Sequence, residues 1–237
     1  VYKREYQHSA YYAGDDPTLK TWPGYDAFAQ TEDACEYIRQ HAEESFFLTL
    51  SLGPPHFPHH NAPEEFQALF LPEDIQFPPN VVFDDSESEA FTRNEAAGYY
   101  AHIAALDQCV GYIIEALDEN GVAEYTILVF ASDHSEMMWS HQRRPYTKQI
   151  FWYESCRVPF LLRYPPCTAE HRGRQLTTPL GTVDIMPTLL SLCGLEIPQP
   201  VQGNDLSACV RDGVELCLLY TSPSPRDLST SRMPSSA

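Results

Sequence analysis

Positive charge is scarce in this sequence. Its 237 residues include 15 lysines and arginines against 33 aspartates and glutamates, which gives a formal net charge of −18 at pH 7. At this charge, long-range repulsion opposes binding to nucleic acid or to an anionic membrane surface. We therefore expect no nucleic-acid partner. An anionic small-molecule substrate would need a local cationic pocket that offsets the overall charge.

The chain also lacks any apolar run near the ~20 residues that a membrane span requires, so we predict no membrane span. Its start, VYKREYQHSA, is not a signal peptide. Because Val1 stands where a start methionine would be, we expect the chain to begin within a longer coding sequence, and the cellular location stays open. The seven cysteines have no CxxC spacing. Most lie in apolar helix or strand patterns, where we expect small buried side chains.

Apolar residues follow strand-like runs and helical spacings in turn along the chain. One helical stripe has three- and four-residue spacing and stops at Asn120-Gly121, a common helix end. This stripe, which we expect to pack in the core, consists of Tyr99, Ile103, Leu106, Val110, Ile113 and Leu117. The other predicted elements are a helix at 32–44 capped by Thr31, buried strands at 46–52, 126–130 and 158–164, and a helix at 184–193. This order predicts an α/β fold with a mostly parallel sheet sandwiched by helices.

Five chemically active side chains lie within 16 residues after the predicted strand at 126–130, namely Asp133, His134, Glu136, His141 and Lys148. The first two follow the carboxyl end of that strand, where open α/β sheets place ligands and chemistry. A carboxylate beside an imidazole can hold a divalent cation, and a lysine further along can neutralise an anionic substrate. A single Asp-His pair after a strand is more often a loop cap with a surface histidine, and that interpretation stays open.

His56 lies just past the end of the predicted strand at 46–52, as Asp133 lies past its own strand. The simpler interpretation is a loop histidine packed between prolines. A zinc site made of His56, His59 and His60 is disfavoured, because HFPHH does not place two ligands on one helix face. The acidic run at 84–89 most simply indicates a solvated face.

Three ordered motifs resemble the catalytic domain of type I sulfatases, in the alkaline phosphatase-like superfamily. SDHSEMM…SH…KQ…YES.RVPFLLRYP is similar to the family pattern SDHGEMLG.HG…K…YEES.RVP. Upstream, FFLTLSLGPPHFP resembles the family's PFFL…PH.P segment, and downstream VDIMPTLL with CGL resembles its VDI.PTLL…GL helix. The resemblance extends to about Leu206. It implies the C-terminal part of the catalytic domain, an alkaline phosphatase-like α/β fold incomplete at its N-terminus.

The resemblance also implies a reaction, the hydrolysis of a sulfate ester of a small molecule or glycan to an alcohol and sulfate. Asp133 and His134 would be ligands of a calcium ion. His56 and Lys148 would bind the sulfate, and His141 would assist the leaving group, so His141 and Lys148 are the expected catalytic residues. Such an enzyme would fit a periplasmic or secreted location.

Sulfatases of this type use a formylglycine nucleophile, made from Cys or Ser within C/S-x-P-x-R, and two further aspartates. The sequence contains no C/S-x-P-x-R. We therefore expect these groups to lie outside this chain, and the chain by itself to be inactive.

The sequence departs from the family pattern close to the candidate site. Ser135, Trp139 and Gln142 stand where the pattern has glycine, and two extra residues separate His141 from Lys148. Glycine often marks a left-handed or closely approached backbone, so these three losses are consistent with either a reshaped site or a decayed one. Across the insertion, Arg143 and Arg144 are alternative cations to Lys148.

From Cys217 the sequence reads CLLYTSPSPRD and then continues without periodicity, which resembles a translated sequencing adapter. We predict a partial catalytic domain at 1–216 and a non-native or disordered tail at 217–237. Two other functions stay open. One is a phosphate or phosphonate monoester hydrolase of the same superfamily, and the other is a non-catalytic binder of sulfated glycans.

Overall fold

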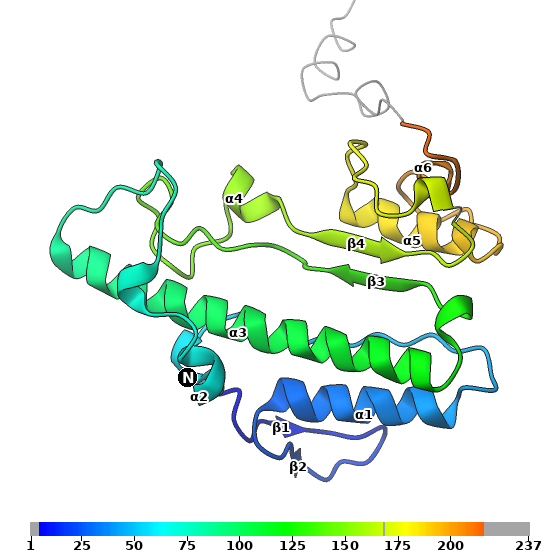
Figure 1. Cartoon of the computed structure of the whole chain (residues 1–237), viewed down its shortest axis with the longest axis horizontal. Helices are drawn as coiled ribbons and strands as arrows, with labels where there is room; N and C mark the ends of the chain where they lie inside the picture. The colour runs from blue at the N-terminus through cyan, green and yellow to red at the C-terminus, as the bar shows by residue number, and fades with distance from the viewer. Residues whose placement is uncertain (1–4, 168, 216–237) are drawn as a thin grey trace, which may run out of the picture. The chain divides into compact units, whose positions relative to one another are not determined.

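The computed structural model describes residues 5–167 and 169–215, and the predicted tail at 217–237 lies outside them. The chain separates into two compact units, Val1–Arg163 (unit 1) and Tyr164–Ala237 (unit 2). Figure 1 shows the elements of each unit. Within the described ranges, no helix combines the length and the apolar character that crossing a membrane requires.

Unit 1 contains two long helices and two short sheets (Figure 1). Its helices are α1 (Asp26–Gln40), α2 (Glu64–Gln67), α3 (Ser86–Glu119) and α4 (Tyr153–Cys156), with 3-10 turns at His59–Asn61, Pro72–Asp74 and Ala123–Tyr125. Its strands are β1 (Ala10–Tyr11) paired with β2 (Lys20–Thr21), and β3 (Leu128–Ala131) paired with β4 (Phe160–Arg163).

Helix α3 begins in the acidic run that the sequence assigned to a solvated face. The Asp85 carboxylate caps this helix by accepting the Ser88 N–H at 2.7 Å, and Glu87 and Glu89 lie in the first turn. Acidic side chains are favourable there because the helix dipole is positive at its N-terminus. The solvated-face interpretation was therefore incomplete.

The core face of α3 consists of small side chains. Ala101 and Ala105 are fully buried and Cys109 nearly so, in a cluster with Tyr25 and Ala27 at the start of α1. Small residues allow the two helices to approach closely, as Figure 1 shows. The predicted core stripe is therefore only partly correct: Leu117 is buried, whereas Ile103 is 41% exposed.

Helix α1 begins earlier than predicted, at Asp26. Thr31 is fully buried in mid-helix, and its hydroxyl donates to the Ala27 carbonyl at 2.7 Å. The predicted Thr31 cap was therefore wrong. A threonine hydroxyl can bond the carbonyl four residues earlier as readily as it caps a helix, so the residue type alone does not distinguish the two.

The strand predictions need a correction in direction and in burial. β3 and β4 pair antiparallel, with Leu128 opposite Arg163 and Ala131 opposite Phe160, so the parallel arrangement expected for them was wrong. An apolar run does not encode strand direction. Neither face of β3 is fully buried, and Phe130 is 37% exposed. Residues 46–52 alternate in exposure but form no strand in the described chain, where Phe47 is 85% exposed.

Unit 2 contains the 3-10 turn Ala169–His171, α5 (Thr182–Leu192) and α6 (Ser207–Asp212). The helix predicted at 184–193 is confirmed within a residue or two. Asp184, 5% exposed, accepts the Gly181 N–H at 2.8 Å and the Asn204 N–H at 2.7 Å. These bonds secure the start of α5.

The burial of the cysteines agrees only in part with the prediction. Cys109 and Cys209 are buried as predicted, whereas Cys156 and Cys193 are exposed.

A buried histidine connects α3 to the loop that carries His56. His102 is fully buried, with Nδ1 2.6 Å from the Tyr25 hydroxyl and Nε2 3.2 Å from the Pro58 carbonyl oxygen. Burial disfavours the charged imidazole and lowers the pKa of His102 from 6.5 to about 4. The folded chain therefore holds this side chain neutral near pH 7.

We predict that unit 1 loses stability as the pH falls from 6.5 towards 4. In this range the unfolded chain binds a proton at His102 that the folded chain does not, so the free energy of unfolding falls with pH. A pKa shift from 6.5 to about 4 corresponds to about 3 kcal/mol over the full range. Urea denaturation at several pH values measures the slope. The matched variant His102→Gln does not titrate and should show a smaller slope; equal slopes would contradict the assignment.

We also predict opposite effects for alanine at two glycines of α3. A Cβ at Gly98 would overlap the backbone carbonyl of His59, whereas a Cβ at Gly111 would meet no atom within 4 Å. Gly98→Ala should lower the free energy of unfolding by about 2 kcal/mol, because backbone must move. Gly111→Ala should raise it by about 0.5–1 kcal/mol, since alanine favours a helix. Thermal denaturation of both variants gives the comparison, and a stable Gly98→Ala protein would refute the close contact.

Candidate active site

The candidate site lies on the long connection between β3 and β4, residues 132–159, here called the site loop. Antiparallel pairing brings the two ends of this loop together. The Ser135 N–H donates to the Ser155 carbonyl at 2.9 Å, and the Met137 N–H donates to the Thr147 carbonyl at 3.1 Å. These bonds fold the loop back on itself, so that residues distant in sequence become neighbours.

Asp133 and His134 follow β3 directly, as predicted. Nδ1 of His134 lies 3.0 Å from the Ser135 carbonyl oxygen, which can only accept, so Nδ1 carries the proton. In the neutral ring, Nε2 then has a lone pair, and it lies 3.5 Å from Oδ2 of Asp133. With that lone pair, Nε2 and the Asp133 carboxylate have the chemistry of two ligands of one cation.

This pair fits part of a calcium site. Calcium binds its ligands at about 2.4 Å, so two adjacent ligands lie about 3.4 Å apart, close to the separation of these two atoms. Calcium needs six to eight ligands, mostly oxygen. Over residues 5–167 and 169–215, no group of three or more His, Cys, Asp and Glu side chains is arranged to hold a metal ion.

Lys148 is held from two sides. The Ser155 hydroxyl donates to the Lys148 carbonyl, which ties this residue to the start of the loop through the Ser135–Ser155 bond. The Lys148 ammonium lies 5.8 Å from the centre of the Phe57 ring, within range of a cation–π contact. The His56 ring stacks on the same phenyl ring at 4.4 Å. The structure thus brings Lys148 and His56 together around Phe57.

Glu136, one of the five side chains that follow the predicted strand at 126–130, lies near Lys148. The sequence pattern alone assigns no function to it. Burial raises the pKa of Glu136, and the positive charge of Lys148 partly offsets this effect. The carboxylate also accepts the Met137 N–H at 3.0 Å. A half-buried acid near the lysine is a group that sequence reasoning could have selected by its position between Asp133 and Lys148.

His141 belongs to a different part of the loop. Its Nε2 lies 3.2 Å from Oε1 of Glu154 and 3.3 Å from the Asn80 amide nitrogen, and its ring packs edge-on against Trp152 at 4.5 Å. The polar contacts of His141 are therefore with Glu154 and Asn80. Nothing in the sequence pointed to Asn80, which lies 61 residues away.

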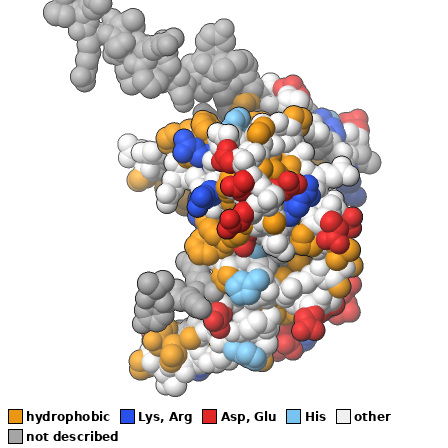
Figure 2. All heavy atoms as spheres, turned by 90° about the vertical axis from the view of Figure 1, so that its left-hand side faces the viewer, with side chains coloured by type: hydrophobic (Ala, Val, Ile, Leu, Met, Phe, Trp, Pro, Cys, Tyr) orange, Lys and Arg blue, Asp and Glu red, His pale blue; other side chains and the backbone are white. Residues whose placement is uncertain are grey.

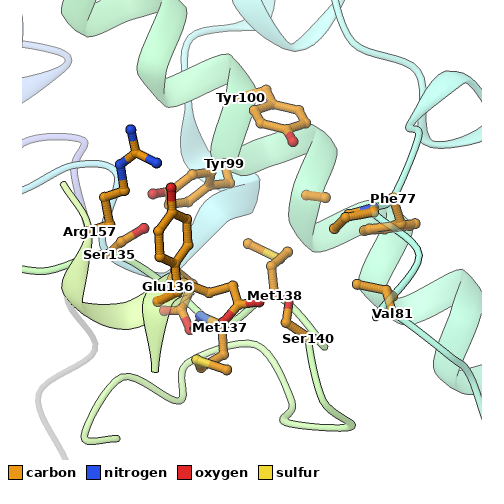
Figure 3. Close-up of a pocket in the computed structure, with 14 residues that line it drawn as sticks. Phe77, Val81, Tyr99, Tyr100, Ser135, Glu136, Met137, Met138, Ser140 and Arg157 are labelled. Carbon is orange, nitrogen blue, oxygen red and sulfur yellow. Dashed lines mark hydrogen bonds between the residues drawn. The ribbon is translucent and has the colours of Figure 1, made fainter. Parts of the chain in front are cut away.

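A cavity of about 310 Å³ lies between α3 and the site loop. Figure 3 shows Tyr99 of α3 next to Ser135, Glu136 and Arg157 on its wall, with Met137, Met138, Phe77 and Val81 completing the apolar part. Glu154, the partner of His141, also lines it. The cavity thus has a mixed polar and aromatic wall, a composition typical of sites for small organic ligands.

Basic side chains are set among acidic ones on the face that Figure 2 shows. Arg143 lies over the Trp152 ring at 5.5 Å and Arg144 over the Trp139 ring at 5.9 Å. Both alternative cations therefore stack on indole rings, whereas Lys148 lies beside His56 and Phe57.

Comparison with known proteins identifies the family of the chain. The family model described as sulfatase matches residues 2–195. The chain belongs to the sulfatase family. An ulvan-active sulfatase from Formosa agariphila is 40% identical over 210 residues, which cover 88% of this chain and 40% of that protein. An endo-4-O-sulfatase from Bacteroides thetaiotaomicron is 34% identical over 173 residues, covering 70% of this chain and 32% of that protein.

The crystal structure of yidJ from Bacteroides fragilis superposes with a TM-score of 0.81 at 30% identity, covering 90% of this chain and 48% of that one. The predicted α/β, alkaline phosphatase-like fold class is therefore confirmed, with the correction that β3 and β4 are antiparallel. This sulfatase-family chain spans less than half the length of these three proteins.

Two of the three departures from the sulfatase glycine pattern fall on left-handed backbone. Trp139 has φ 71° and Gln142 has φ 58°, values that glycine adopts without a steric penalty, whereas Ser135 is not left-handed. Trp139 is 3% exposed and its indole N–H donates to the Val82 carbonyl at 3.2 Å, so packing holds its backbone in place. Gln142 is exposed, with one long bond of 3.4 Å to Asp84.

We predict that Gln142→Gly stabilises unit 1 by about 0.5–1 kcal/mol. A non-glycine residue in the left-handed region costs about 1–2 kcal/mol, and the greater freedom of glycine in the unfolded chain offsets part of the gain. Thermal denaturation should show a melting temperature higher by a few degrees. Gln142→Ala, which removes the same side chain but not the strain, is the matched control and should give no gain. If both variants behave alike, backbone strain at Gln142 is ruled out.

Proposed function

We propose that the complete protein containing this chain hydrolyses sulfate esters to an alcohol and inorganic sulfate. The observation that carries the proposal is the placement of Lys148 and His56 around one phenyl ring. Lys148 lies on the site loop, whose start presents Asp133 and His134, and His56 lies on a separate loop. Membership of the sulfatase family supports the same reaction. It does not favour the phosphate or phosphonate alternative.

Lys148 and His56 bind the sulfate group in this proposal. The ester carries one negative charge, and more charge gathers on the bridging oxygen as the sulfur–oxygen bond breaks. A preorganised ammonium and an imidazole N–H stabilise that charge best where water is excluded. Because the chain as a whole is strongly acidic, this local cation also offsets the repulsion that a sulfate would otherwise meet.

His141 protonates the leaving alcohol oxygen. The Glu154 carboxylate, 3.2 Å from Nε2, orients the imidazole. This pair lies at the edge of the cavity between α3 and the site loop, since Glu154 lines that cavity. The leaving alcohol would therefore occupy the cavity, and its mixed polar and aromatic wall suits a sugar ring.

Asp133 and His134 would hold a calcium ion as two of its ligands. The chemistry that such an ion would supply is polarisation of the sulfate ester and orientation of a formylglycine nucleophile. The sequence contains no C/S-x-P-x-R from which formylglycine could be made. The nucleophile and the remaining metal carboxylates would therefore come from the rest of the complete protein, and the chain of 237 residues by itself would not turn over.

A sulfated carbohydrate is the proposed substrate class. Two relatives are, by name, an ulvan-active sulfatase and an endo-4-O-sulfatase. A sulfated-glycan binder without catalysis would share the cationic and aromatic groups but would not release sulfate. Sulfate release therefore separates the two functions.

We predict that Lys148→Ala in the complete protein lowers kcat/KM for sulfate-ester hydrolysis roughly a hundredfold, with folding intact. This is the scale of losing one preorganised charge contact in the transition state. Release of sulfate from sulfated oligosaccharides and from an aryl sulfate provides the assay.

Arg144→Ala is the matched control, because Arg144 lies on the Trp139 ring, away from Phe57. It should retain most of the activity. A near-normal Lys148→Ala enzyme together with a crippled Arg143→Ala or Arg144→Ala enzyme would reject Lys148 as the sulfate-binding cation. Faster turnover of a phosphonate ester than of any sulfate ester would reject the sulfatase proposal itself.

A further inference from the structure

A cluster behind the candidate site joins three separate segments of unit 1. It consists of His59 from the loop that carries His56, Glu95 from α3, and Tyr146 from the site loop, and is here called the Glu95 cluster. Nδ1 of His59 lies 2.7 Å from Oε2 of Glu95, and the Tyr146 hydroxyl interacts with the same carboxylate. The rings of His59 and Tyr146 lie 5.7 Å apart. One carboxylate therefore holds both loops.

The bond to Glu95 is the polar anchor of His59. The imidazole is 1% exposed, and its Nε2 is buried without a hydrogen-bond partner among the described residues. The backbone of His59 also lies against α3 at Gly98, too close to admit a Cβ there. The orientation of this side chain, and with it the end of the His56 loop, thus depends on one residue of α3.

Each loop carries a proposed sulfate-binding residue close to the cluster. His56 precedes His59 by three residues, and Lys148 follows Tyr146 by two. Phe57 joins the two sides, because its ring lies 4.5 Å from Tyr146, 4.4 Å from His56 and 5.8 Å from the Lys148 ammonium. A shift of either loop would change the distance between His56 and Lys148.

The cluster favours a charged Glu95. Burial by itself raises the pKa of a carboxyl group, but the hydrogen bonds from His59 and Tyr146 and the nearby histidine charges outweigh it, so the pKa of Glu95 is lowered. An ionised carboxylate accepts from two converging donors, one at each oxygen. An amide offers only one acceptor atom and would turn its own N–H groups towards a donor.

We propose that Glu95 is a positioning residue that sets the distance between the two sulfate-binding side chains by holding both loops on α3. The role rests on the proposed function, since its purpose is the alignment of His56 and Lys148 on one anion. Glu95 itself touches no reacting atom. Misplacement of binding groups by about 1 Å can cost a hundredfold in rate, so a remote carboxylate can govern activity.

The test compares Glu95→Ala, Glu95→Gln and Tyr146→Phe in the complete protein, with Glu115→Ala as the control. Glu115 lies on the same helix, exposed and near its far end. Glu95→Ala should lower kcat/KM for sulfate-ester hydrolysis about 10- to 100-fold, with a raised KM and a reduced kcat. Glu95→Gln, which keeps one acceptor, should recover part of this loss. Glu115→Ala should match the wild type.

A double-mutant cycle tests the shared carboxylate. Tyr146→Phe removes only a hydroxyl and should lower kcat/KM several-fold in the wild type but hardly at all in Glu95→Ala, since both changes break the same bond. If Tyr146→Phe lowered kcat/KM by the same factor in Glu95→Ala as in the wild type, the two residues would act independently and the proposal would be overturned. Tyr146→Phe also keeps the test decisive if Glu95→Ala fails to fold.

Hydrogen–deuterium exchange on the same proteins gives a readout that does not need activity. Glu95→Ala should speed exchange in residues 54–62 and 142–150 together, with α3 unchanged, and Glu115→Ala should not. If the wild type hydrolyses sulfate esters but Glu95→Ala leaves kcat/KM and exchange unaltered, the positioning role is overturned and the proposed function stands. If the wild type hydrolyses no sulfate ester, the proposed function fails, and coupled exchange of the two loops still decides whether Glu95 holds them.

Discussion

The antiparallel pairing of β3 with β4 is the constraint on which the candidate site depends. Ala131 lies opposite Phe160, so the site loop leaves and re-enters the sheet at neighbouring points. Bringing the two ends of an irregular loop of this length together costs chain entropy. The hydrogen bonds between β3 and β4 offset that cost, and they also fix the directions in which the loop leaves and re-enters the sheet. Beyond the strand ends, hydrogen bonds from Ser155 to Ser135 and to Lys148 hold the two sides of the loop together. Asp133 and Lys148 consequently share one closed segment.

Helix α3 supports this loop and the His56 loop from one side. Its small face lets α1 pack closely, and its Gly98 admits the backbone of His59. Catalytic geometry held on rigid elements is more precise than geometry held by loops alone. Here the proposed binding groups lie on loops, and in our proposal a long helix supplies the rigidity through His59, Glu95 and Tyr146. His102 and its contact to Pro58 do the same further along the helix.

Backbone strain concentrates in the site loop. Met138, Trp139, His141, Gln142 and Tyr146 all have positive φ without being glycine. Such conformations persist where the surroundings over-determine them, and they cluster at functional sites. The buried indole of Trp139 and its bond to Val82 provide such surroundings. At Trp139 and Gln142, where the sulfatase pattern has glycine, the chain therefore keeps a left-handed backbone. At Trp139, side-chain packing holds it.

Much of the site followed from the sequence itself, because its signals are local. The Asp133-His134 pair, Lys148 and the motifs around them are contiguous in the chain, and they identified the family and the fold class. The helix at α5 was predictable for the same reason, since the VDIMPTLL motif that indicates it is contiguous in the sequence.

Only the tertiary structure decided which residues meet. Strand direction, the antiparallel ladder and the burial of small rather than large side chains on α3 depend on partners far away in the chain. Asn80 beside His141 and Glu95 beside His59 and Tyr146 carry no local pattern, since each contact joins separate segments. Periodicity records which face of an element is apolar, but not which element covers it. Long-range contacts arise only when the whole unit packs, and that packing places both His56 and Lys148 beside the Phe57 ring.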